Sequence, residues 1–273
     1  MSTRSALITV MHKASMAASR RMMRDFGEVE NLQVSRKGAA DFVSQADISA
    51  ENTIREELEK ARPGWGFIME EAGKIPPQTD DAPVWIIDPI DGTTNFLHGI
   101  PHFAISIAVM KGGRLIAGTI LDPSRHEFYF AEAGKGAFLN NRRIRVSGRR
   151  KVSEALFATG IPFLGRGSAQ TDAQFMAEML AVMPHCAGIR RFGSAALDLA
   201  FVAAGRYDGY WERGLSLWDV AAGILLVREA GGFVSDFGSR DPISSSGQFS
   251  GDIVTGNQSL HVPLLKMLRE AGK

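Results

Sequence analysis

The chain has 273 residues, 45% of them hydrophobic, which suffices for a substantial core in one large α/β domain or two intimate halves. Lys and Arg number 31 against 30 Asp and Glu, so no strong net positive charge is available to recruit nucleic acid or an anionic membrane. The longest apolar segments, such as 103–110 and 220–227, are far shorter than the roughly 20 residues of a membrane-spanning helix. The single cysteine, Cys186, excludes an internal disulfide and suits a reducing cytoplasm.

The first segment of the chain is basic, with no acidic residue before Asp25, and in that respect it resembles an organellar transit peptide. It also carries apolar residues at helical spacing, namely Leu7, Val10, Met11, Ala14 and Ala18. This spacing favours an ordinary amphipathic helix that packs on the core. His12 and Lys13 interrupt the apolar run that a secretory signal would need. We therefore expect a first helix and a cytoplasmic protein.

The pattern changes at residues 37–47. Within this stretch, residues 42–44 predict a short strand, and helical periodicity resumes from Ile48 to about Lys60. Asp47 stands immediately before that helix, where an aspartate commonly serves as the N-cap. The residues alone leave open whether Asp47 caps the helix, belongs to a functional site, or does both.

A second strand is predicted at residues 67–69, and two acids, Glu70 and Glu71, follow it. Because adjacent residues of a strand point to opposite faces, only one of these glutamates can face an acid on a neighbouring strand. Residues 73–83 contain three prolines and no hydrophobic pattern, which predicts an exposed connecting loop.

The stretch with the clearest chemistry is Val84-Trp85-Ile86-Ile87-Asp88-Pro89-Ile90-Asp91-Gly92-Thr93-Thr94-Asn95-Phe96. Its first residues are β-branched or aromatic and predict a buried strand, which Pro89 is expected to end because proline has no N–H for the ladder. Asp88 would then lie at the tip of that strand. Asp91, three residues later, opens a Gly- and Thr-rich turn whose free N–H groups and hydroxyls suit an anion.

Two carboxylates this close together repel one another, and the pKa of one rises unless cations lie between them. Hard cations that prefer oxygen ligands, such as Mg²⁺, meet that need. The stretch therefore indicates metal-assisted phosphoryl chemistry. Asp-Pro and Asp-Gly are also common turn signals, and an Asp91 that merely caps a helix would produce a similar pattern.

A β-meander is predicted after this stretch. Residues 103–110 and 115–121 are apolar runs joined by a Gly-Gly turn, which is a hairpin signal, and two further strand candidates lie at 127–131 and 134–138. Residues 140–144 turn into a basic segment that we interpret as solvated surface. Three histidines, His98, His102 and His126, are interpreted as ordinary loop or hairpin residues.

The second half of the chain begins after a seam at residues 148–153. It is predicted to contain a strand at 156–159 and a helix at 172–183, which Pro184 ends. Gly193 and Ser194 open a second helix, closed by Gly205, and helix openings of this kind offer free N–H groups to anions. This signal is weak by itself, because serine N-caps are common.

Two more acidic residues, Glu212 and Asp219, lie near the ends of predicted elements in the rest of the chain. Residues 207–212 predict a strand that ends at Glu212, and Asp219 starts a helix that runs to residue 230. Asp219 as a simple helix cap is the alternative to a functional role. Strands are predicted at 233–237 and 252–255, and a closing helix at 260–272.

Two strings in this chain resemble signatures of the inositol monophosphatase family. Residues 88–96 match D-P-[IL]-D-G-T-x-N-F, and residues 218–223 match W-D-x-A-[AG]-G. With these strings included, motif matches at 37–47, 67–71, 84–96, 193–196 and 207–223 follow in the order of the family, and 190–232 is especially similar to its bacterial extragenic-suppressor branch. The resemblance implies an α+β fold, the layered α-β-α-β-α sandwich shared with fructose-1,6-bisphosphatase, formed by one domain over residues 1–273.

The resemblance also implies a functional role for each matching residue. The implied Mg²⁺ ligands are Glu70, Asp88, Asp91, Asp219 and the Ile90 carbonyl. The implied catalytic residues are Glu70, Thr93 and Asp47, of which Thr93 and Asp47 orient the attacking water. The implied substrate contacts are Asp91, Gly92, Thr93, Gly193, Ser194, Ala195, Glu212 and Asp219. Glu212 would accept hydrogen bonds from ring hydroxyls, and the alternative is a surface glutamate paired with Arg213 or Arg206.

The expected activity is Mg²⁺-dependent hydrolysis of a small phosphorylated polyol, first of all myo-inositol 1-phosphate, by water and without a covalent nucleophile. The same ligand set serves phosphatases of histidinol phosphate, fructose 1,6-bisphosphate and 3′-phosphoadenylates, so these alcohols stay open. The resemblance further implies a homodimer and inhibition by Li⁺. Members of the bacterial branch are associated with transcription complexes, and a contact with that machinery is the alternative role, although the near-neutral charge predicts no autonomous nucleic-acid binding.

Overall fold

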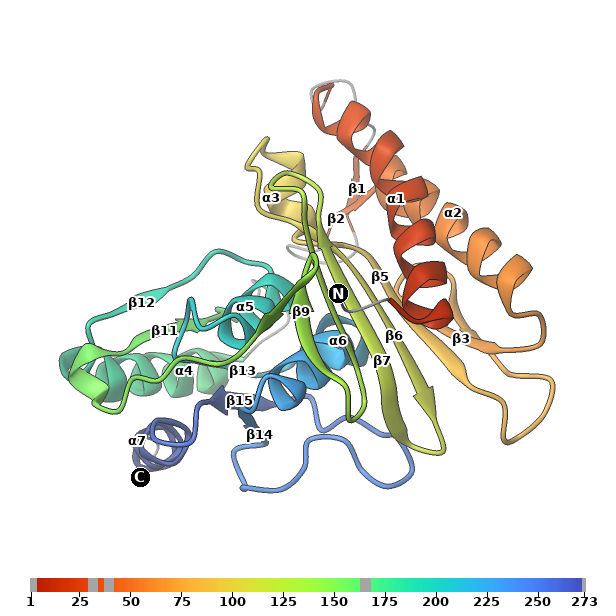
Figure 1. The fold of residues 1–273 in the computed structure, drawn as a ribbon. Helices are drawn as coiled ribbons and strands as arrows, with labels where there is room; N and C mark the ends of the chain where they lie inside the picture. Colours follow the sequence, from red (N-terminus) through yellow and green to blue (C-terminus); the bar gives the residue numbers. More distant parts are fainter. Residues whose placement is uncertain (1–3, 29–33, 37–41, 163–167, 272–273) are drawn as a thin grey trace.

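The predicted first helix is α1 (Ala6–Phe26) in the computed structural model, which describes residues 4–28, 34–36, 42–162 and 168–271. The Ser5 hydroxyl caps it by accepting a hydrogen bond from the Ile8 amide. One face is buried, with Ile8, Met11, Ala14, Ser15, Ala18, Ser19 and Met22 inside. The helix packs beside α2 (Gln45–Ala61), and both helices lie on one face of the larger sheet (Figure 1). The amphipathic interpretation of this segment is therefore confirmed.

The larger sheet has eight strands among the described residues, in the order β10-β9-β8-β7-β6-β5-β3-β4. In chain order they are β3 (Gly66–Met69), β4 (Gly73–Ile75), β5 (Val84–Asp91), β6 (Ala104–Lys111), β7 (Arg114–Asp122), β8 (Glu127–Glu132), β9 (Gly136–Leu139) and β10 (Arg142–Ile144). The predicted hairpin is formed by β6 and β7, and its turn residues Gly112 and Gly113 have φ values of 55° and 73°. Positive φ at both turn positions suits glycine and a right-twisted hairpin.

Two segments that looked like loop or free surface are short strands at the edges of this sheet. In the expected loop 73–83, β4 pairs antiparallel with β3, with Phe67 opposite Ile75. In the basic segment, β10 pairs with β9. Edge strands have few buried side chains, so their pairing depends on the main chain and leaves no alternating hydrophobic pattern. Residues 37–41 of the predicted stretch 37–47 lie outside the described residues, and β1 (Val34–Arg36) pairs with the predicted strand β2 (Phe42–Ser44).

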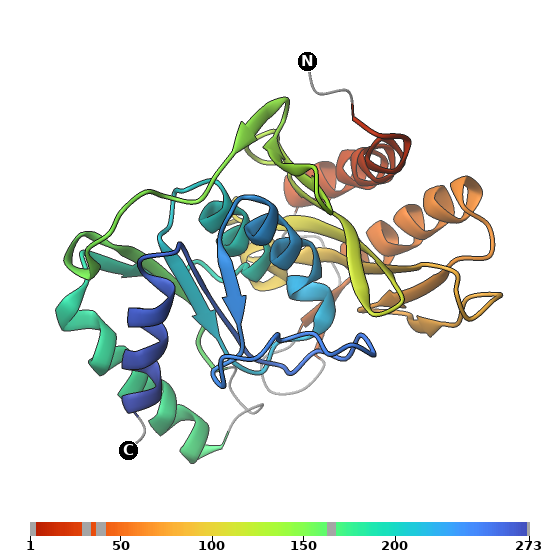
Figure 2. The same cartoon turned by 60° about the horizontal axis from the view of Figure 1, so that its bottom comes forward.

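The smaller sheet has five strands, in the order β12-β11-β13-β15-β14, within the part of the chain that the structure describes. Its strands are β11 (Leu156–Thr159), β12 (Gly188–Arg190), β13 (Gly209–Glu212), β14 (Phe233–Ser235) and β15 (Ile253–Gly256). Two helices, α4 (Ala169–Val182) and α7 (His261–Glu270), cover its outer face (Figure 2). Short 3-10 turns occur at η2 (Val152–Glu154) and η3 (Met183–His185), the latter containing Pro184.

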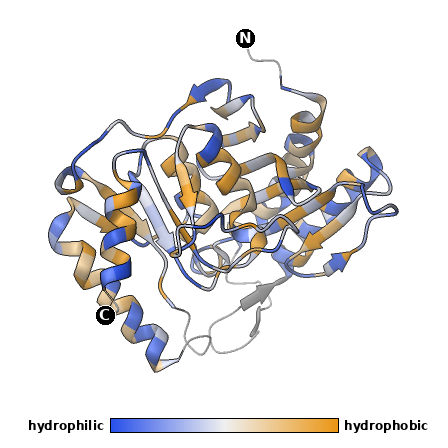
Figure 3. Cartoon of the chain, turned by 90° about the horizontal axis from the view of Figure 1, so that it is seen from below, coloured by the Kyte–Doolittle hydropathy of each residue, from blue (hydrophilic) through white to orange (hydrophobic). Residues whose placement is uncertain are grey.

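Two helices lie between the sheets, α5 (Ala195–Ala203) and α6 (Leu217–Glu229), and complete the expected α-β-α-β-α sandwich. Figure 3 shows hydrophobic segments among the elements in the middle of the molecule. In α6, every residue from Val220 to Val227 is buried and uncharged. A helix that is apolar all round is typically buried among other elements, as α6 is between the two sheets. Gly223 permits the close approach of α5, because a Cβ there would lie 2.5 Å from Leu199 Cβ.

No helix among the described residues is both long and apolar enough to span a membrane.

Candidate active site

Strand β5 does not end at Pro89 as predicted; it continues to Asp91 through a β-bulge. Asp88 pairs with Ser106 and Asp91 pairs with Ala104, so two residues of β5 lie opposite one residue of β6. A bulge accommodates a proline because the extra residue is left out of the ladder. The irregularity separates Asp88 from Asp91 without breaking the strand, and both carboxylates line the same pocket.

Gly92 turns the chain from β5 into the short helix α3 (Thr93–Leu97). Its φ of 100° is a conformation that L side chains rarely adopt, and a Cβ would lie 3.0 Å from the His102 carbonyl oxygen. The turn is held from the other side by Asn95, whose Nδ2 donates 2.8 Å and 2.7 Å hydrogen bonds to the carbonyls of His102 and Phe192. The anion-binding turn predicted from the sequence is thus a tightly packed junction between the two halves of the chain.

Thr93 and Asp47 meet beside this turn, although 46 positions separate them in the chain. The Thr93 hydroxyl lies 2.9 Å from the Ile90 carbonyl oxygen and 3.4 Å from Asp47 Oδ1. Asp47 is 1% exposed and lies in the first turn of α2, which begins at Gln45. The alternative that Asp47 is the N-cap of this helix is therefore wrong. Its carboxylate points to the strand junction instead.

Glu70, and not Glu71, lines the pocket with Asp88. Strand alternation predicted that only one of the two glutamates would do so, and the family resemblance implied Glu70. The chain reverses directly after it, and the reversal is held by Glu51 of α2. The two carboxylate oxygens of Glu51 accept hydrogen bonds of 2.9 Å from the Glu71 amide and 2.8 Å from the Ala72 amide. Glu51 is 3% exposed, so these charge-assisted bonds replace the water that its carboxylate has lost.

The N-terminus of α5 holds the carboxylate of Asp91. The Ser194 hydroxyl donates a 2.5 Å hydrogen bond to Asp91 Oδ2, and the Ala196 amide donates one of 2.7 Å to the same oxygen. A helix N-terminus favours an anion because its first N–H groups have no partner within the helix. Burial nevertheless dominates and raises the pKa of Asp91 to about 6, while the bonds from Ser194 and Ala196 lower it.

Asp219 is both a helix-capping residue and a residue of the pocket lining. Its Oδ2 accepts a 2.7 Å hydrogen bond from the Ser216 amide, as the third residue of a capping box at the start of α6. The same side chain lines the pocket with Glu70, Asp88 and Asp91. Capping fixes its position, so the carboxylate is held at the pocket by the local geometry of the helix.

Glu212 lies at the end of β13, where the hydroxyl of Tyr210 donates a hydrogen bond to it. It does not pair with Arg213 or Arg206, so the surface ion-pair alternative is wrong; Arg213 binds Glu178 and Asp252, and Arg206 binds Glu127. Burial raises the pKa of Glu212 to about 7, with a further rise from nearby Asp91 and opposing effects from Tyr210 and Arg191.

These side chains enclose a pocket of about 110 Å³. Its described lining consists of Glu70, Asp88, Ile90, Asp91, Gly92, Thr93, Thr94, Asn95, Gly160, Arg191, Gly193, Ser194, Ala195, Glu212, Leu215 and Asp219. Every implied metal ligand and every implied substrate contact is in this set, and Asp47 adjoins it through Thr93. Of the three histidines, His102 is buried and stacks on Phe192, outside the lining.

The pocket has the donor chemistry of a hard-cation site. Asp88 is 1% exposed and its Oδ1 has no hydrogen-bond partner. Burial raises the pKa of Asp88 well above its usual range, and Glu70, Asp91, Asp219 and Asp47 raise it further. A divalent cation would lower the pKa of Asp88 and give its unpartnered Oδ1 a ligand partner. Among the described residues, however, no group of three or more His, Cys, Asp or Glu side chains is placed to hold a metal ion as it stands.

Comparison with known proteins identifies this arrangement. Residues 3–272 match the model of the inositol monophosphatase family. The chain belongs to that family. It is 54% identical to inositol-1-monophosphatase of Mesorhizobium japonicum, over 98% of this chain and 97% of that protein. It is 44% identical to the Nus factor SuhB of Pseudomonas aeruginosa, over 96% of both chains.

The fold agrees with the family assignment. The crystal structure of extragenic suppressor protein suhB from Bartonella henselae matches this chain with a TM-score of 0.92 and 50% sequence identity. The match covers 97% of this chain and 99% of that chain. The implied sandwich fold is thereby confirmed, and the chain is an enzyme of a phosphatase family.

Sequence reasoning missed several residues of the pocket, among them Arg191 and Gly160, which the two family signatures do not contain. Arg191 is the one cationic side chain among the described lining residues, which include five carboxylates. Gly160 follows β11, and a Cβ there would lie 1.9 Å from Glu212 Cδ. The Arg190-Arg191 pair just before Gly193 was a visible signal for the first. Nothing in the sequence places Gly160 beside Glu212, because that contact depends on strand pairing.

Proposed function

We propose that this enzyme is a Mg²⁺-dependent phosphatase of small phosphorylated polyols and that myo-inositol 1-phosphate is its substrate. The observation that carries the proposal is the convergence of carboxylates from the turn after β3, from β5 and from α6 on one pocket beside the Asp47–Thr93 pair. The substrate is supported by relatives at 49% to 54% identity that are named inositol-1-monophosphatase. We further propose a cytoplasmic homodimer in which residues 1–273 act as one domain.

The Mg²⁺ ligands in this proposal are Glu70, Asp88, Asp91, Asp219 and the Ile90 carbonyl. When bound, Mg²⁺ would neutralise the phosphate, lower the pKa of a water molecule and stabilise the leaving alkoxide. The unpartnered Asp88 Oδ1 and the all-oxygen donor set fit such an ion. Asp91 keeps its position through the bonds from Ser194 and Ala196, which leave its second oxygen for the pocket.

The protein's own groups orient the reactants. The Thr93 hydroxyl, supported by the buried Asp47 carboxylate, would hold the attacking water in line with the phosphorus–oxygen bond. The amides of Gly92 and Thr93, at the start of α3, would donate hydrogen bonds to the phosphate. Glu212 would accept hydrogen bonds from hydroxyls of the alcohol, and Gly193, Ser194 and Ala195 of the same lining would also contact the substrate.

Phosphate release from wild-type protein and Asp88→Asn tests the proposal, assayed with and without Mg²⁺ across sugar, inositol, amino-alcohol and nucleotide monoesters. We expect Mg²⁺-dependent release that Asp88→Asn lowers by about 10²–10³-fold, because a charge at the reacting centre is lost. Asp241→Asn, on an exposed loop, is the matched control. Metal-free Asp88→Asn should melt at the same or a higher temperature than wild type, since a buried carboxylate beside other acids is removed. Undiminished turnover in Asp88→Asn would refute the assignment.

A contact with the transcription machinery is the second candidate function. It is favoured by relatives at 40% to 44% identity that bear the name Nus factor SuhB. Affinity purification from native lysate, with wild type and Asp88→Asn as bait, separates the two roles. Retention of RNA polymerase by both proteins would show a binding role independent of catalysis, and its absence from both would remove this candidate.

A further inference from the structure

A second cavity, of about 390 Å³, adjoins the active-site pocket. Its described lining consists of Thr159, Gly160, Ile161, Pro162, Thr171, Phe175, Glu178, Trp211, Glu212, Arg213, Gly214 and Asp252. We call it the side cavity. Gly160 and Glu212 belong to the lining of both spaces. A group bound in the side cavity would therefore lie next to the residue that we propose to contact the alcohol portion of the substrate.

Apart from its four charged residues, the described wall of the side cavity is mainly apolar. Ile161 and Pro162 come from the chain after β11, Phe175 from α4, and Trp211 from β13. Trp211 is 1% exposed, whereas Ile161 is 42% exposed at the rim. Apolar and aromatic side chains with a few polar groups, around a volume of roughly 300–1,000 Å³, are typical of small-molecule sites.

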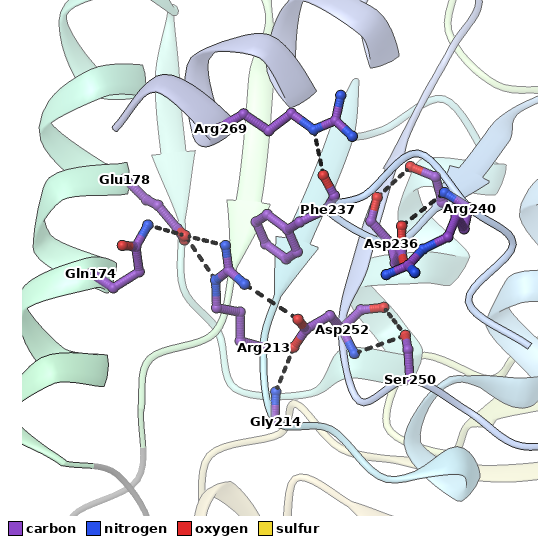
Figure 4. Close-up of polar contacts among 11 residues, drawn as sticks. Gln174, Glu178, Arg213, Gly214, Asp236, Phe237, Arg240, Ser250, Asp252 and Arg269 are labelled. Atoms are coloured by element: carbon purple, nitrogen blue, oxygen red, sulfur yellow. Dashed lines mark hydrogen bonds and ion pairs between the residues drawn. The ribbon is translucent and has the colours of Figure 1, made fainter. Parts of the chain in front are cut away.

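The one positive charge of the described wall, on Arg213, is engaged by two of its carboxylates. Arg213 Nε donates a 2.8 Å hydrogen bond to Glu178 Oε1, and its Nη1 lies 3.2 Å from Asp252 Oδ2 (Figure 4). Glu178 is 1% exposed and also accepts a 3.1 Å hydrogen bond from Gln174. Because the one guanidinium is engaged by two carboxylates, no cation of the described wall is left to bind an anionic ligand.

The same contacts fix the shape of the cavity. The Arg213 guanidinium lies over the Phe237 ring at 3.3 Å from its centroid, and Asp252 also accepts a 3.4 Å hydrogen bond from the Gly214 amide. Figure 4 shows that these groups join α4 to the chain after β13 and to the loops beside β14 and β15. A cavity held by an ion-paired network is already formed before a ligand arrives, which lowers the entropy cost of binding.

Glu212 forms the boundary between the two spaces. Its carboxylate packs on Gly160, which has no side chain to hold it away from the backbone. The Tyr210 hydroxyl donates a hydrogen bond to the Glu212 carboxylate and helps to hold it in place. If one hydroxyl of a polyol donates a hydrogen bond to Glu212, the neighbouring atoms of that polyol therefore lie at the entrance of the side cavity.

We propose that the side cavity is a subsite for a neutral, apolar substituent, about one ring in size, carried by the alcohol portion of the phosphate monoester. The inference rests on the proposed phosphatase function and narrows its substrate class. The engaged Arg213 and the neighbouring carboxylates disfavour a second phosphate or a carboxylate at this position, because an anion placed there would meet unbalanced negative charge. The reaction itself, hydrolysis of the ester by water, is unchanged.

The test compares two substrates that share the reacting phosphate, glycerol 2-phosphate and 1-O-benzylglycerol 2-phosphate. Wild-type enzyme with Mg²⁺ should show a kcat/KM about tenfold or more higher for the benzyl ether, mainly through a lower KM, because several apolar carbons leave water. A third substrate, 1,2-bisphosphoglycerol, should gain nothing from its second phosphate. Phosphate release from glycerol 2-phosphate without any benzyl preference would overturn the subsite and leave the phosphatase function standing.

Two variants and a control assign the preference to the cavity. Phe175→Ala removes part of the apolar wall, and Ile161→Trp fills the space from its exposed rim. Both should reduce the benzyl preference to within about twofold of unity while turnover of glycerol 2-phosphate stays near wild type. Met176→Ala on the same helix is 55% exposed and outside the lining, so it should retain the full preference. Melting temperatures confirm that each variant is folded.

A binding measurement decides the case even if no phosphate is released from any substrate. Saturation-transfer NMR with the alcohol 1-O-benzylglycerol reports protein contact at the aromatic protons without turnover. We expect saturation in wild type and Met176→Ala, and its loss in Ile161→Trp. Equal saturation in all three proteins, or none in wild type, would overturn the subsite; absence of turnover would instead count against the proposed function alone.

Discussion

Glu212 and Gly160 touch so closely that a single methyl group cannot be placed between them: a Cβ on Gly160 would lie 1.9 Å from both Cδ and Oε1 of Glu212. The two residues are 52 positions apart and meet because β11 and β13 run parallel, with Thr159 opposite Trp211. The Gly160 backbone and the Glu212 carboxylate together form the part of the pocket lining that we propose contacts the alcohol portion of the substrate. The position of Glu212 therefore depends on the absence of a side chain at residue 160.

The first prediction follows from this contact. Gly160→Ala should displace the Glu212 carboxylate and lower kcat/KM for myo-inositol 1-phosphate by about tenfold or more, because polar groups of substrate and site are left unpaired. Glycerol 2-phosphate, which is too small to depend on Glu212, should lose less than about threefold. Steady-state kinetics on both substrates measure the difference.

Glu212→Ala is the companion variant and should show the same pattern, with a loss of roughly 1–3 kcal/mol on the inositol ester alone. Equal losses on both esters would mean that the contact is structural. No loss on either would leave the inositol assignment supported by family membership only.

Arg191 gives the second prediction. A phosphate dianion must enter a pocket lined by five carboxylates and this one cation. Arg191→Ala should lower kcat/KM several-fold at low salt, and the loss should shrink near 0.5 M salt, where the screening length is only a few ångströms. Arg150→Ala, an exposed arginine outside the pocket, is the control and should change nothing. A loss that is independent of ionic strength would argue against electrostatic attraction as its cause.

Asp198 gives a prediction about stability and pH. It is 1% exposed, its Oδ1 has no hydrogen-bond partner, and burial together with nearby Glu212 raises its pKa well above the usual range. A raised native pKa stabilises the fold below the pKa of the unfolded chain, and this contribution is lost as the pH rises through the native pKa. Metal-free Asp198→Asn should therefore melt increasingly above wild type as pH rises, in thermal scans from pH 5 to pH 10.

Asp208 is the matched control for that measurement, because it is equally buried but fully bonded. It accepts hydrogen bonds from the Ser147 hydroxyl, the Arg149 guanidinium and the Leu156 amide. Asp208→Asn should lower the free energy of unfolding by roughly 1–3 kcal/mol, since donors that face a carboxylate lose their partner. A pH-independent difference between wild type and Asp198→Asn would contradict the assignment of a protonated Asp198.

Lithium provides the last prediction. Li⁺ is a small hard cation that can take an oxygen-lined position without supplying the divalent charge that phosphate needs. At saturating Mg²⁺, Li⁺ should inhibit phosphate release, whereas Na⁺ at equal ionic strength should not. Turnover that is indifferent to Li⁺, at concentrations that inhibit another family member assayed in parallel, would count against the proposed ion positions.

The order of the elements was predictable from local sequence, and the family resemblance implied most of the residues that line the pocket. The strand at 84–88, the Gly-Gly hairpin and the helix that starts near Asp219 each depend on neighbours within a few residues, which periodicity and turn chemistry detect. The two family signatures then placed Asp88, Asp91 and Asp219 in one site. Even so, the end of β5 was misjudged, because a bulge lets a strand continue past Pro89 and its stability comes from pairing with β6.

Only the tertiary structure decided which distant residues meet. Asp47 reaches Thr93, and Ser194 reaches Asp91 over 103 positions, because α2 and α5 pack against opposite faces of the larger sheet. The contact of Gly160 with Glu212, the position of Arg191 and the paired charges of the side cavity are likewise products of strand order and helix packing. A sequence pattern shows which side chains each helix, strand and turn carries. The distances between those groups, and so the raised pKa values and the shape of the pocket, are set by how the layers pack.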